Sequence, residues 1–243
     1  FCLVWILFFG ITASADILGI EEFNYSDGAI AGQAGGQYWD WNNTTGVHTD
    51  TVSNWNAVFG SPVVQNNALF IDSSGARREY NGPTEGAGDG TDERLGAFRG
   101  SGTVYYGVTL TELTENSWCG FSSYDFGTER IFFGRPGGSQ FFGIEISGSG
   151  RALSTIPVVV GQTYRLVSAL DFDGDQLRLW VNPDSSDYDH GIADNSADVT
   201  LAYTGSNWST SVRLAGGAQS LWDDLVVSDS FTDIAGPAIT HAF

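Results

Sequence analysis

The sequence predicts an all-β protein with the pattern of a sandwich or barrel, and three observations support this fold class. No long stretch shows helical periodicity, while short runs of β-branched and aromatic residues recur along the chain. Turn-forming clusters of Gly, Ser, Thr, Asn and Asp separate these runs, and the chain contains 32 Gly. Several runs alternate apolar and polar residues, so that one face of each strand would pack on a core.

The predicted strands follow one another from the first third of the chain to its end. In order they are Ala68–Ile71, Thr103–Leu113, Trp118–Tyr124, Arg130–Phe133, Phe141–Ile146, Tyr164–Phe172, Gln176–Val181, Val199–Tyr203, Ser211–Leu214 and Leu221–Val227. Asp173-Gly174 lies between two of these runs. Because Gly supplies the positive φ of a tight primed turn, this dipeptide predicts a β-hairpin. Residues 72–102 and 183–198 are expected to be long loops.

In the second strand of that hairpin, apolar and other side chains alternate. Leu177, Leu179 and Val181 are expected to share the face that packs on the core. Arg178 and Trp180 would then lie on the opposite face, against solvent or a second layer.

The N-terminus is an apolar run from Phe1 to Ile11, followed by small residues and a first charge at Asp16. This pattern is typical of a secretory signal peptide, and the run is shorter than the roughly 20 apolar residues of a membrane-spanning helix. We expect residues 1–15 to be a signal peptide that has lost its first residues, and residues 16–243 to be one exported domain. A buried N-terminal strand or helix is the alternative.

Charge and cysteine content narrow the function classes. The chain has a net charge of −19, with ten Arg, no Lys and 29 Asp plus Glu. Such a field repels nucleic acid and anionic membranes, so we expect no nucleic-acid partner and no membrane insertion. It favours solubility and cation binding. Beyond the signal peptide only Cys119 remains, which excludes an intrachain disulfide and, in its aromatic setting, predicts a buried, unreactive thiol.

Several motifs resemble those of a known group of secreted bacterial modules. In chain order they are Glu22–Tyr25, Gly28–Gln33, Gly35–Gly36, Phe132–Gly138, Val160–Val167, Asp171–Gly174, Leu177–Asp184 and Trp222–Val227. Their order resembles the laminin-G-like, concanavalin A-like lectin–glucanase superfamily. The resemblance implies a two-sheet antiparallel jelly-roll sandwich, a carbohydrate-binding or adhesion role and, in some members, a bound calcium ion. It implies no particular ligand, since one such fold hosts lectins, glycosidases and structural modules.

A stretch rich in tryptophan is the candidate carbohydrate-binding site. Trp39, Asp40, Trp41 and Asn42 are consecutive, and Trp55 follows nearby. Aromatic rings stack on the C–H surfaces of sugars, while Asp and Asn side chains bond to hydroxyl groups. The alternative is that these tryptophans pack in the core or at a sheet edge.

Three acidic residues at the predicted hairpin are the candidate metal ligands. Asp171, Asp173 and Asp175 offer the hard oxygen atoms that Ca²⁺ prefers, which makes calcium the one cofactor suggested by the sequence. The loop is not an EF-hand, because Gln176 and Asn182 stand where that motif needs Gly and Glu. The alternative is an acidic turn without a metal. A second acidic group is open to the same two interpretations: Asp184, Asp187, Asp189 and Asp194.

No catalytic pattern stands out. Related hydrolases of the superfamily that the chain resembles carry Glu-x-Asp-x-(x)-Glu on one strand. This string is absent here. Glu21 and Glu22 are adjacent and would point to opposite faces, and Glu145 is isolated. We therefore predict a secreted or cell-surface, non-catalytic module that binds polysaccharide or another cell-surface glycan, with or without calcium. A structural or adhesion domain without a sugar site, and less favourably a glycoside hydrolase or lyase, stay open as alternatives.

Overall fold

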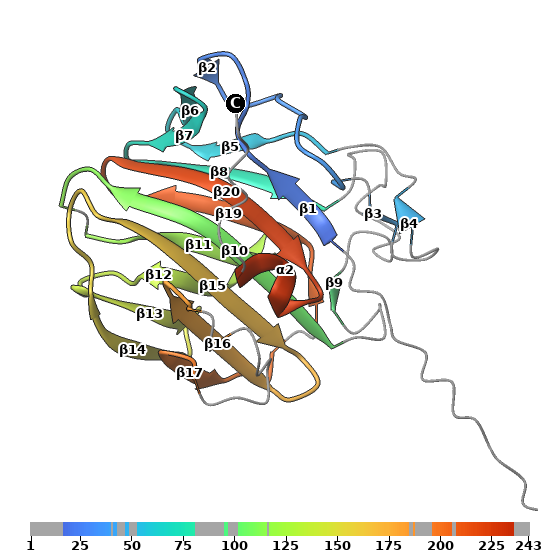
Figure 1. Cartoon of the computed structure of the whole chain (residues 1–243), viewed down its shortest axis with the longest axis vertical. Helices are drawn as coiled ribbons and strands as arrows, with labels where there is room; N and C mark the ends of the chain where they lie inside the picture. The colour runs from blue at the N-terminus through green and yellow to red at the C-terminus, as the bar shows by residue number, and fades with distance from the viewer. Residues whose placement is uncertain are drawn as a thin grey trace, which may run out of the picture.

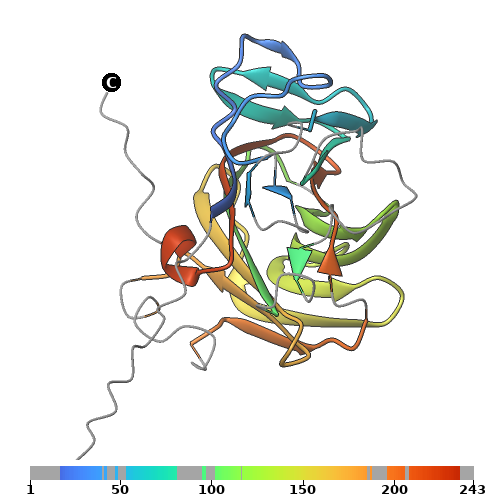
Figure 2. The same ribbon diagram turned by 90° about the vertical axis from the view of Figure 1, so that its right-hand side faces the viewer.

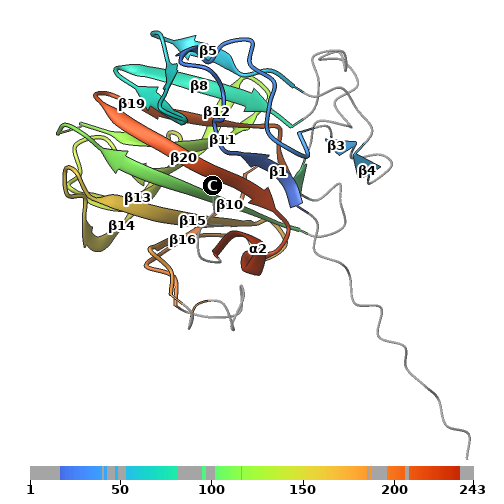
Figure 3. The same cartoon turned by 45° about the horizontal axis from the view of Figure 1, so that its top comes forward.

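The computed structural model describes residues 17–39, 41–42, 47–48, 53–80, 95–96, 102–115, 117–184, 187, 196–205 and 208–235. Two antiparallel sheets within these residues pack face to face as a sandwich (Figure 1). The larger sheet has the order β17 (Val199–Ala202), β16 (Gln176–Val181), β15 (Thr163–Asp171), β10 (Thr103–Glu112), β20 (Ser220–Ser228), β7 (Ala68–Ile71), β6 (Val63–Gln65) and β2 (Gly28–Ala29). A ninth strand, β1 (Ile17–Glu21), pairs with β20, beside which it lies in Figure 3.

The smaller sheet has seven strands. Their order is β14 (Gly150–Pro157), β13 (Phe141–Ile146), β12 (Thr128–Arg135), β11 (Cys119–Asp125), β19 (Ser211–Gly216), β8 (Ser74–Glu79) and β5 (Asn56–Phe59). Two short pairs lie outside both sheets: β18 (Trp208–Ser209) with β9 (Leu95–Gly96), and β3 (Trp41–Asn42) with β4 (Val47–His48). The predicted all-β jelly-roll sandwich is confirmed.

The predicted hairpin is present, but its backbone differs from the expectation. β15 and β16 pair with Asp171 opposite Gln176. The left-handed residue of the turn is Asp175, with φ of 52°, and Gly174 is not in that region. Gly174 instead lies close to Asp171: its N–H donates to Asp171 Oδ1 at 2.8 Å, and an added Cβ would come within 2.4 Å of the Asp171 carboxylate.

The core lies between the two sheets and follows the alternation seen in the sequence. Leu177, Leu179 and Val181 of β16 are buried there, as predicted. The inward aromatic rings of the smaller sheet include Phe121 and Phe133, whose ring centroids are 5.3 Å apart. Burial of each such side chain contributes about 1.5 to 3 kcal/mol to the free energy of folding, relative to leaving it exposed. Further core residues are Val108, Leu110, Leu166, Phe142 and Leu214.

Cys119 is also buried in this core, as the sequence predicted. Burial raises the pKa of its thiol well above the usual range, because no solvent stabilises a thiolate there. The thiol is therefore unreactive in the folded protein.

The expectation of a loop throughout residues 72–102 is wrong at its start. Ser74–Glu79 forms β8, which pairs with β19 and β5 inside the smaller sheet. Its sequence, SGARRE, has neither β-branched nor aromatic residues, so local propensity gave no strand signal. Arg78 points into the core rather than to solvent, which is possible because Glu21 of the opposite sheet pairs with it there.

The outer faces of the two sheets differ in their covering. Helix α2 (Phe231–Ala235) lies on the outside of the larger sheet (Figures 1 and 2). Phe231 packs on Trp180 and Tyr105, with ring centroids 4.8 Å and 5.9 Å apart. Of the two predicted alternatives for the face of Trp180, solvent or a second layer, the structure therefore has the second layer. The hollow described below lies on the outer face of the smaller sheet.

Candidate functional site

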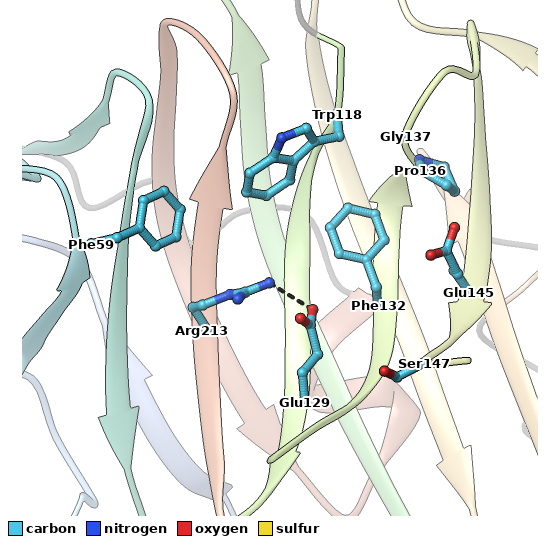
Figure 4. Close-up of a pocket in the computed structure, with 9 residues that line it drawn as sticks. All are labelled: Phe59, Trp118, Glu129, Phe132, Pro136, Gly137, Glu145, Ser147 and Arg213. Carbon is cyan, nitrogen blue, oxygen red and sulfur yellow. Dashed lines mark hydrogen bonds and ion pairs between the residues drawn. The ribbon is translucent and has the colours of Figure 1, made fainter. Parts of the chain in front are cut away.

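The smaller sheet carries a cavity of about 380 Å³ on its outer face. It is lined by aromatic, acidic and small side chains from several strands and the loops between them (Figure 4). The lining residues are Phe59, Trp118, Glu129, Phe132, Pro136, Gly137, Glu145, Ser147 and Arg213. We refer to this hollow as the outer-face cavity.

The strand register explains why this face is hollowed. Across five neighbouring strands, small residues stand opposite one another in a single row: Gly143, Gly134, Gly120, Ala215 and Gly75. With strands spaced about 4.8 Å apart, the row extends for about 20 Å across the sheet. Side chains of this size leave a depression in which neighbouring rings can lie close to the backbone.

Three aromatic rings lie over and beside this row. The Phe132 ring covers Gly120, where a Cβ would overlap it, and a Cβ on Gly75 would come within 2.7 Å of the Phe59 ring. Trp118 stands between them, with its ring centroid 6.2 Å from Phe59 and 6.3 Å from Phe132. Phe59 is 37% exposed and Trp118 is half-buried, so the rings present apolar surface to the cavity (Figure 4).

Arg213 forms one charged wall of the cavity. Its guanidinium donates to Glu129 Oε1 at 2.6 Å, to the Tyr124 hydroxyl at 2.6 Å and to Ser122 Oγ at 3.1 Å. It also lies 5.3 Å from the centroid of the Tyr124 ring. These contacts hold the arginine flat against the sheet, with only 11% of its side chain exposed.

Glu145 forms the opposite charged wall, on β13. Its Oε2 accepts hydrogen bonds from Nε and a terminal nitrogen of Arg151, which stands directly opposite on β14. The remaining terminal nitrogen of Arg151 donates to the Gly137 carbonyl at 3.0 Å. Glu145 also faces Phe132 across the β12–β13 pair, which brings a carboxylate next to an aromatic ring.

This arrangement suits recognition of a ligand with apolar faces and hydroxyl groups. Rings can stack on an apolar face, and the carboxylate oxygens that no arginine occupies can accept hydrogen bonds from hydroxyls. Glu129 and Glu145 each accept a charge-assisted hydrogen bond from an arginine, which holds both carboxylates in place at the cavity.

The sequence-predicted tryptophans lie elsewhere. Trp39 and Trp55 are 0% exposed, so neither has a face on which a sugar could stack. They pack as core residues, which was the alternative interpretation. Asp40 lies outside the described residues, and only the backbone of Trp41 and Asn42, which form β3, is described.

Trp39 and Trp55 enclose a buried ion pair. Arg78 donates to Glu21 Oε2 at 2.6 Å, and its guanidinium lies 4.5 Å from the Trp39 ring centroid and 5.9 Å from that of Trp55. Trp55 Nε1 donates to the same carboxylate at 2.8 Å. Burial lowers the pKa of Arg78, and the charge of Glu21 opposes that shift. The tryptophans therefore stabilise an internal charge.

Two of the three predicted calcium ligands have separate hydrogen-bond partners. Asp171 accepts from Gly174 N and, at 3.3 Å, from Arg178. Asp173 accepts from the Gly102 N–H at 3.1 Å. The described residues include no group of three or more His, Cys, Asp or Glu side chains that could hold a metal ion. The hairpin geometry therefore gives no support to a calcium site at Asp171–Asp175.

Sequence reasoning missed the outer-face cavity, although part of a signal was present. Trp118 and Phe132 were assigned to strands without a binding role, and Glu145 was considered only as an isolated acid. Glycine inside a strand marks a place where another group approaches the backbone closely, and Gly120 and Gly143 are such residues. That these glycines form one row depends on the pairing of β11, β12 and β13, which a single sequence does not reveal.

No family model matches the chain, and no curated protein matches its sequence significantly. Solved structures match in fold. A Trypanosoma rangeli sialidase gives a TM-score of 0.52 at 10% identity, over 88% of this chain and 30% of that chain. Domain 4 of a GH43 extracellular arabinanase from Geobacillus stearothermophilus, in complex with arabinotriose, gives a TM-score of 0.45 at 12% identity. The match covers 92% of this chain and 100% of that domain.

A CBM2 module of an evolved Dit protein from Lactobacillus casei BL23 phage J-1 gives a TM-score of 0.46 at 12% identity, over 88% of this chain and 95% of that module. This chain spans about 30% of the length of the sialidase. At these identities the likeness is one of fold alone. Among the described residues, no helix has the length and apolar character that crossing a membrane requires.

Proposed function

We propose that this protein is a non-catalytic glycan-binding module and that the outer-face cavity is its binding site. The observation that carries the proposal is the grouping of Phe59, Trp118 and Phe132 beside Glu129 and Glu145 in one open hollow. Sugar-binding sites combine an aromatic platform with convergent polar groups in this way.

The proposal includes two expectations from the sequence. The module is secreted or displayed at a cell surface, which is the expectation from the N-terminal apolar segment. It is also a relative of the laminin-G-like, concanavalin A-like superfamily, as its motifs and its two-sheet sandwich suggest. Its partner is then a polysaccharide or another cell-surface glycan.

A panel of immobilised polysaccharides and a glycan array test the proposal directly. We expect the intact chain to bind at least one glycan, and Trp118→Ala to weaken that binding by at least tenfold. Loss of a tryptophan from the centre of a binding surface costs about 2 kcal/mol or more. Tyr38→Ala is the matched control, because Tyr38 is an aromatic residue with 41% exposure that does not line the cavity.

Equal losses for Trp118→Ala and Tyr38→Ala would place the binding site elsewhere. Binding to no glycan would favour the alternative of a structural or adhesion domain. Running the panel with calcium and again with a chelator tests whether calcium assists binding. Since the cavity is lined by residues that form no metal-binding group, we expect binding there to survive chelation.

A glycoside hydrolase is the second candidate, because two carboxylates line the same cavity. Glu129 stands on β12 and Glu145 on β13, next to the aromatic rings. Paired carboxylates on either side of a sugar are what glycoside hydrolysis requires. Release of reducing ends from a bound polysaccharide, abolished in both Glu129→Gln and Glu145→Gln, would establish hydrolysis. Retention of intact polymer by the unmodified chain would support the binding module.

A further inference from the structure

We infer that the outer-face cavity selects uncharged glycans and excludes acidic ones. The inference rests on the proposed function and names the class of ligand for that site. It is based on three observations: the arginines are already paired with carboxylates, the polar atoms open to a ligand are mainly acceptors, and the chain carries a large negative net charge.

The arginines around the cavity already have carboxylate partners. Arg213 is bonded to Glu129, and Arg151 is bonded to Glu145 and to the Gly137 carbonyl. Arg77, next to Arg213 in the sheet, pairs with Glu79 at 3.3 Å. Recognition of a sugar carboxylate or sulfate uses bidentate bonds from an arginine fork. Here each fork would have to leave a carboxylate before it could bind such a group.

The arginines in the rest of the described chain are also bonded to acceptors of the protein itself. The other ion-paired arginines are Arg78 with Glu21, Arg130 with Asp125, Arg135 with Glu112 and Arg178 with Asp171. Arg165 donates to the carbonyls of Asp224 and Ile234 at 2.6 Å and 3.0 Å. The sequence contains no Lys. Within the described residues, every arginine thus bonds to an acceptor of this protein.

The polar atoms that the cavity offers are mainly hydrogen-bond acceptors. Oε2 of Glu129 and Oε1 of Glu145 are the carboxylate oxygens that the arginines do not occupy. The Ser147 hydroxyl can accept or donate, while the donors of the lining are the Trp118 indole N–H and the guanidinium of Arg213. Sugar hydroxyls can donate to these oxygens, whereas a carboxylate or sulfate would meet like charge.

The net charge of the whole chain acts in the same direction. At −19 it produces a negative field that lowers the local concentration of polyanions. Salt screens this field over a Debye length of about 8 Å at physiological ionic strength. The largely buried Arg213–Glu129 pair is screened less than the field of the whole chain, so the exclusion of acidic ligands should persist in part at high salt.

The test compares neutral and acidic polymers with matched backbones, such as a galactan and its sulfated form, at low and at high salt. We expect the unmodified chain to bind the neutral polymer at least tenfold more tightly. Glu145→Gln removes the carboxylate partner of Arg151 and should raise affinity for the acidic polymer by about tenfold, the gain of one charge-assisted bond. Glu129→Gln should act similarly on Arg213.

Glu115→Gln is the control for net charge, because it removes one negative charge from an exposed residue that neither lines the cavity nor is one of the arginine partners named above. Each variant is first checked for an unchanged melting transition. Equal or tighter binding of the acidic polymer by the unmodified chain would overturn the inference and leave the proposed function standing. An equal gain in Glu115→Gln and in both cavity variants would overturn the role of the arginine pairs. Binding of neither polymer class, nor of any other glycan, would remove the proposed function itself.

Discussion

Two clusters in this molecule join aromatic rings to an arginine–glutamate pair, and they differ in what closes over them. In the first, Trp39 and Trp55 enclose Arg78 and Glu21 between the sheets, and all four side chains are at most 1% exposed. In the second, Phe59, Trp118 and Phe132 lie on the outer face of the smaller sheet beside two such pairs, Arg213–Glu129 and Arg151–Glu145. We refer to them as the sealed cluster and the open cluster.

Both clusters place an aromatic ring on a glycine. The Trp39 ring lies against Gly19, where an added Cβ would come within 3.0 Å of it, and Phe132 lies against Gly120 in the same manner. The residue types are therefore nearly the same in both places. Such a set stabilises the fold where a second sheet covers it, and presents aromatic and charged groups to the surroundings where nothing in the described chain covers it.

The largest expected difference between the clusters is the cost of breaking their ion pairs. Arg78→Met leaves the Glu21 carboxylate buried without its cation and should lower the free energy of unfolding by about 3 to 5 kcal/mol. Arg151→Met breaks the half-exposed pair with Glu145 and should cost about 1 kcal/mol or less. Urea unfolding of both variants measures the two costs. Equal costs would contradict the distinction between sealed and open.

The second expected difference concerns the tryptophans. Trp39→Ala should lower the free energy of unfolding by about 3 to 5 kcal/mol, because it leaves a cavity in the core. Trp118→Ala should cost about 1 kcal/mol, since the ring is only half-buried. Thermal and urea unfolding measure stability, and glycan retention at a temperature where both variants are folded measures function. If only Trp39→Ala lost glycan retention, the binding site would lie at the tryptophan-rich stretch that begins at Trp39, as the sequence predicted.

The smallest expected effect is a pH dependence beside the sealed cluster. Burial raises the pKa of Asp223 to about 7, and the charges of Asp224, Glu22 and Glu21 add to the shift, while the Asp224 N–H opposes it. Between about pH 4 and pH 7 the folded state binds this proton and the unfolded state does not. Stability should therefore fall as the pH rises through this range.

Asp223→Asn should remove that part of the pH dependence. Because the side chain is partly exposed and solvent screens it, we expect a gain of about 1 kcal/mol at pH 8 and no gain at pH 4. Urea unfolding of the variant and the unmodified chain at both pH values measures the effect. A variant that is stabilised equally at pH 4 and pH 8 would show that titration of Asp223 is not the cause.

Prediction from the sequence succeeded where the signal was local. The alternation in Gln176–Val181 assigned Leu177, Leu179 and Val181 to the core and Trp180 to the opposite face, and both are observed. It failed at Ser74–Glu79, because two consecutive arginines and a glycine give no local reason to form a central strand. That strand is stabilised by pairing on both edges and by a carboxylate from the other sheet.

The sequence by itself determined the all-β class and the strands with clear alternation, because these depend on a period of two. It also determined the negative net charge and the lack of lysine, which depend on composition alone. Only the tertiary structure decided which aromatic residues are sealed and which are open. Strand register aligned Gly143, Gly134 and Gly120 into a row, and sheet packing covered Trp39 and left Trp118 half-exposed. Both depend on contacts between residues distant in sequence, and no local pattern encodes them.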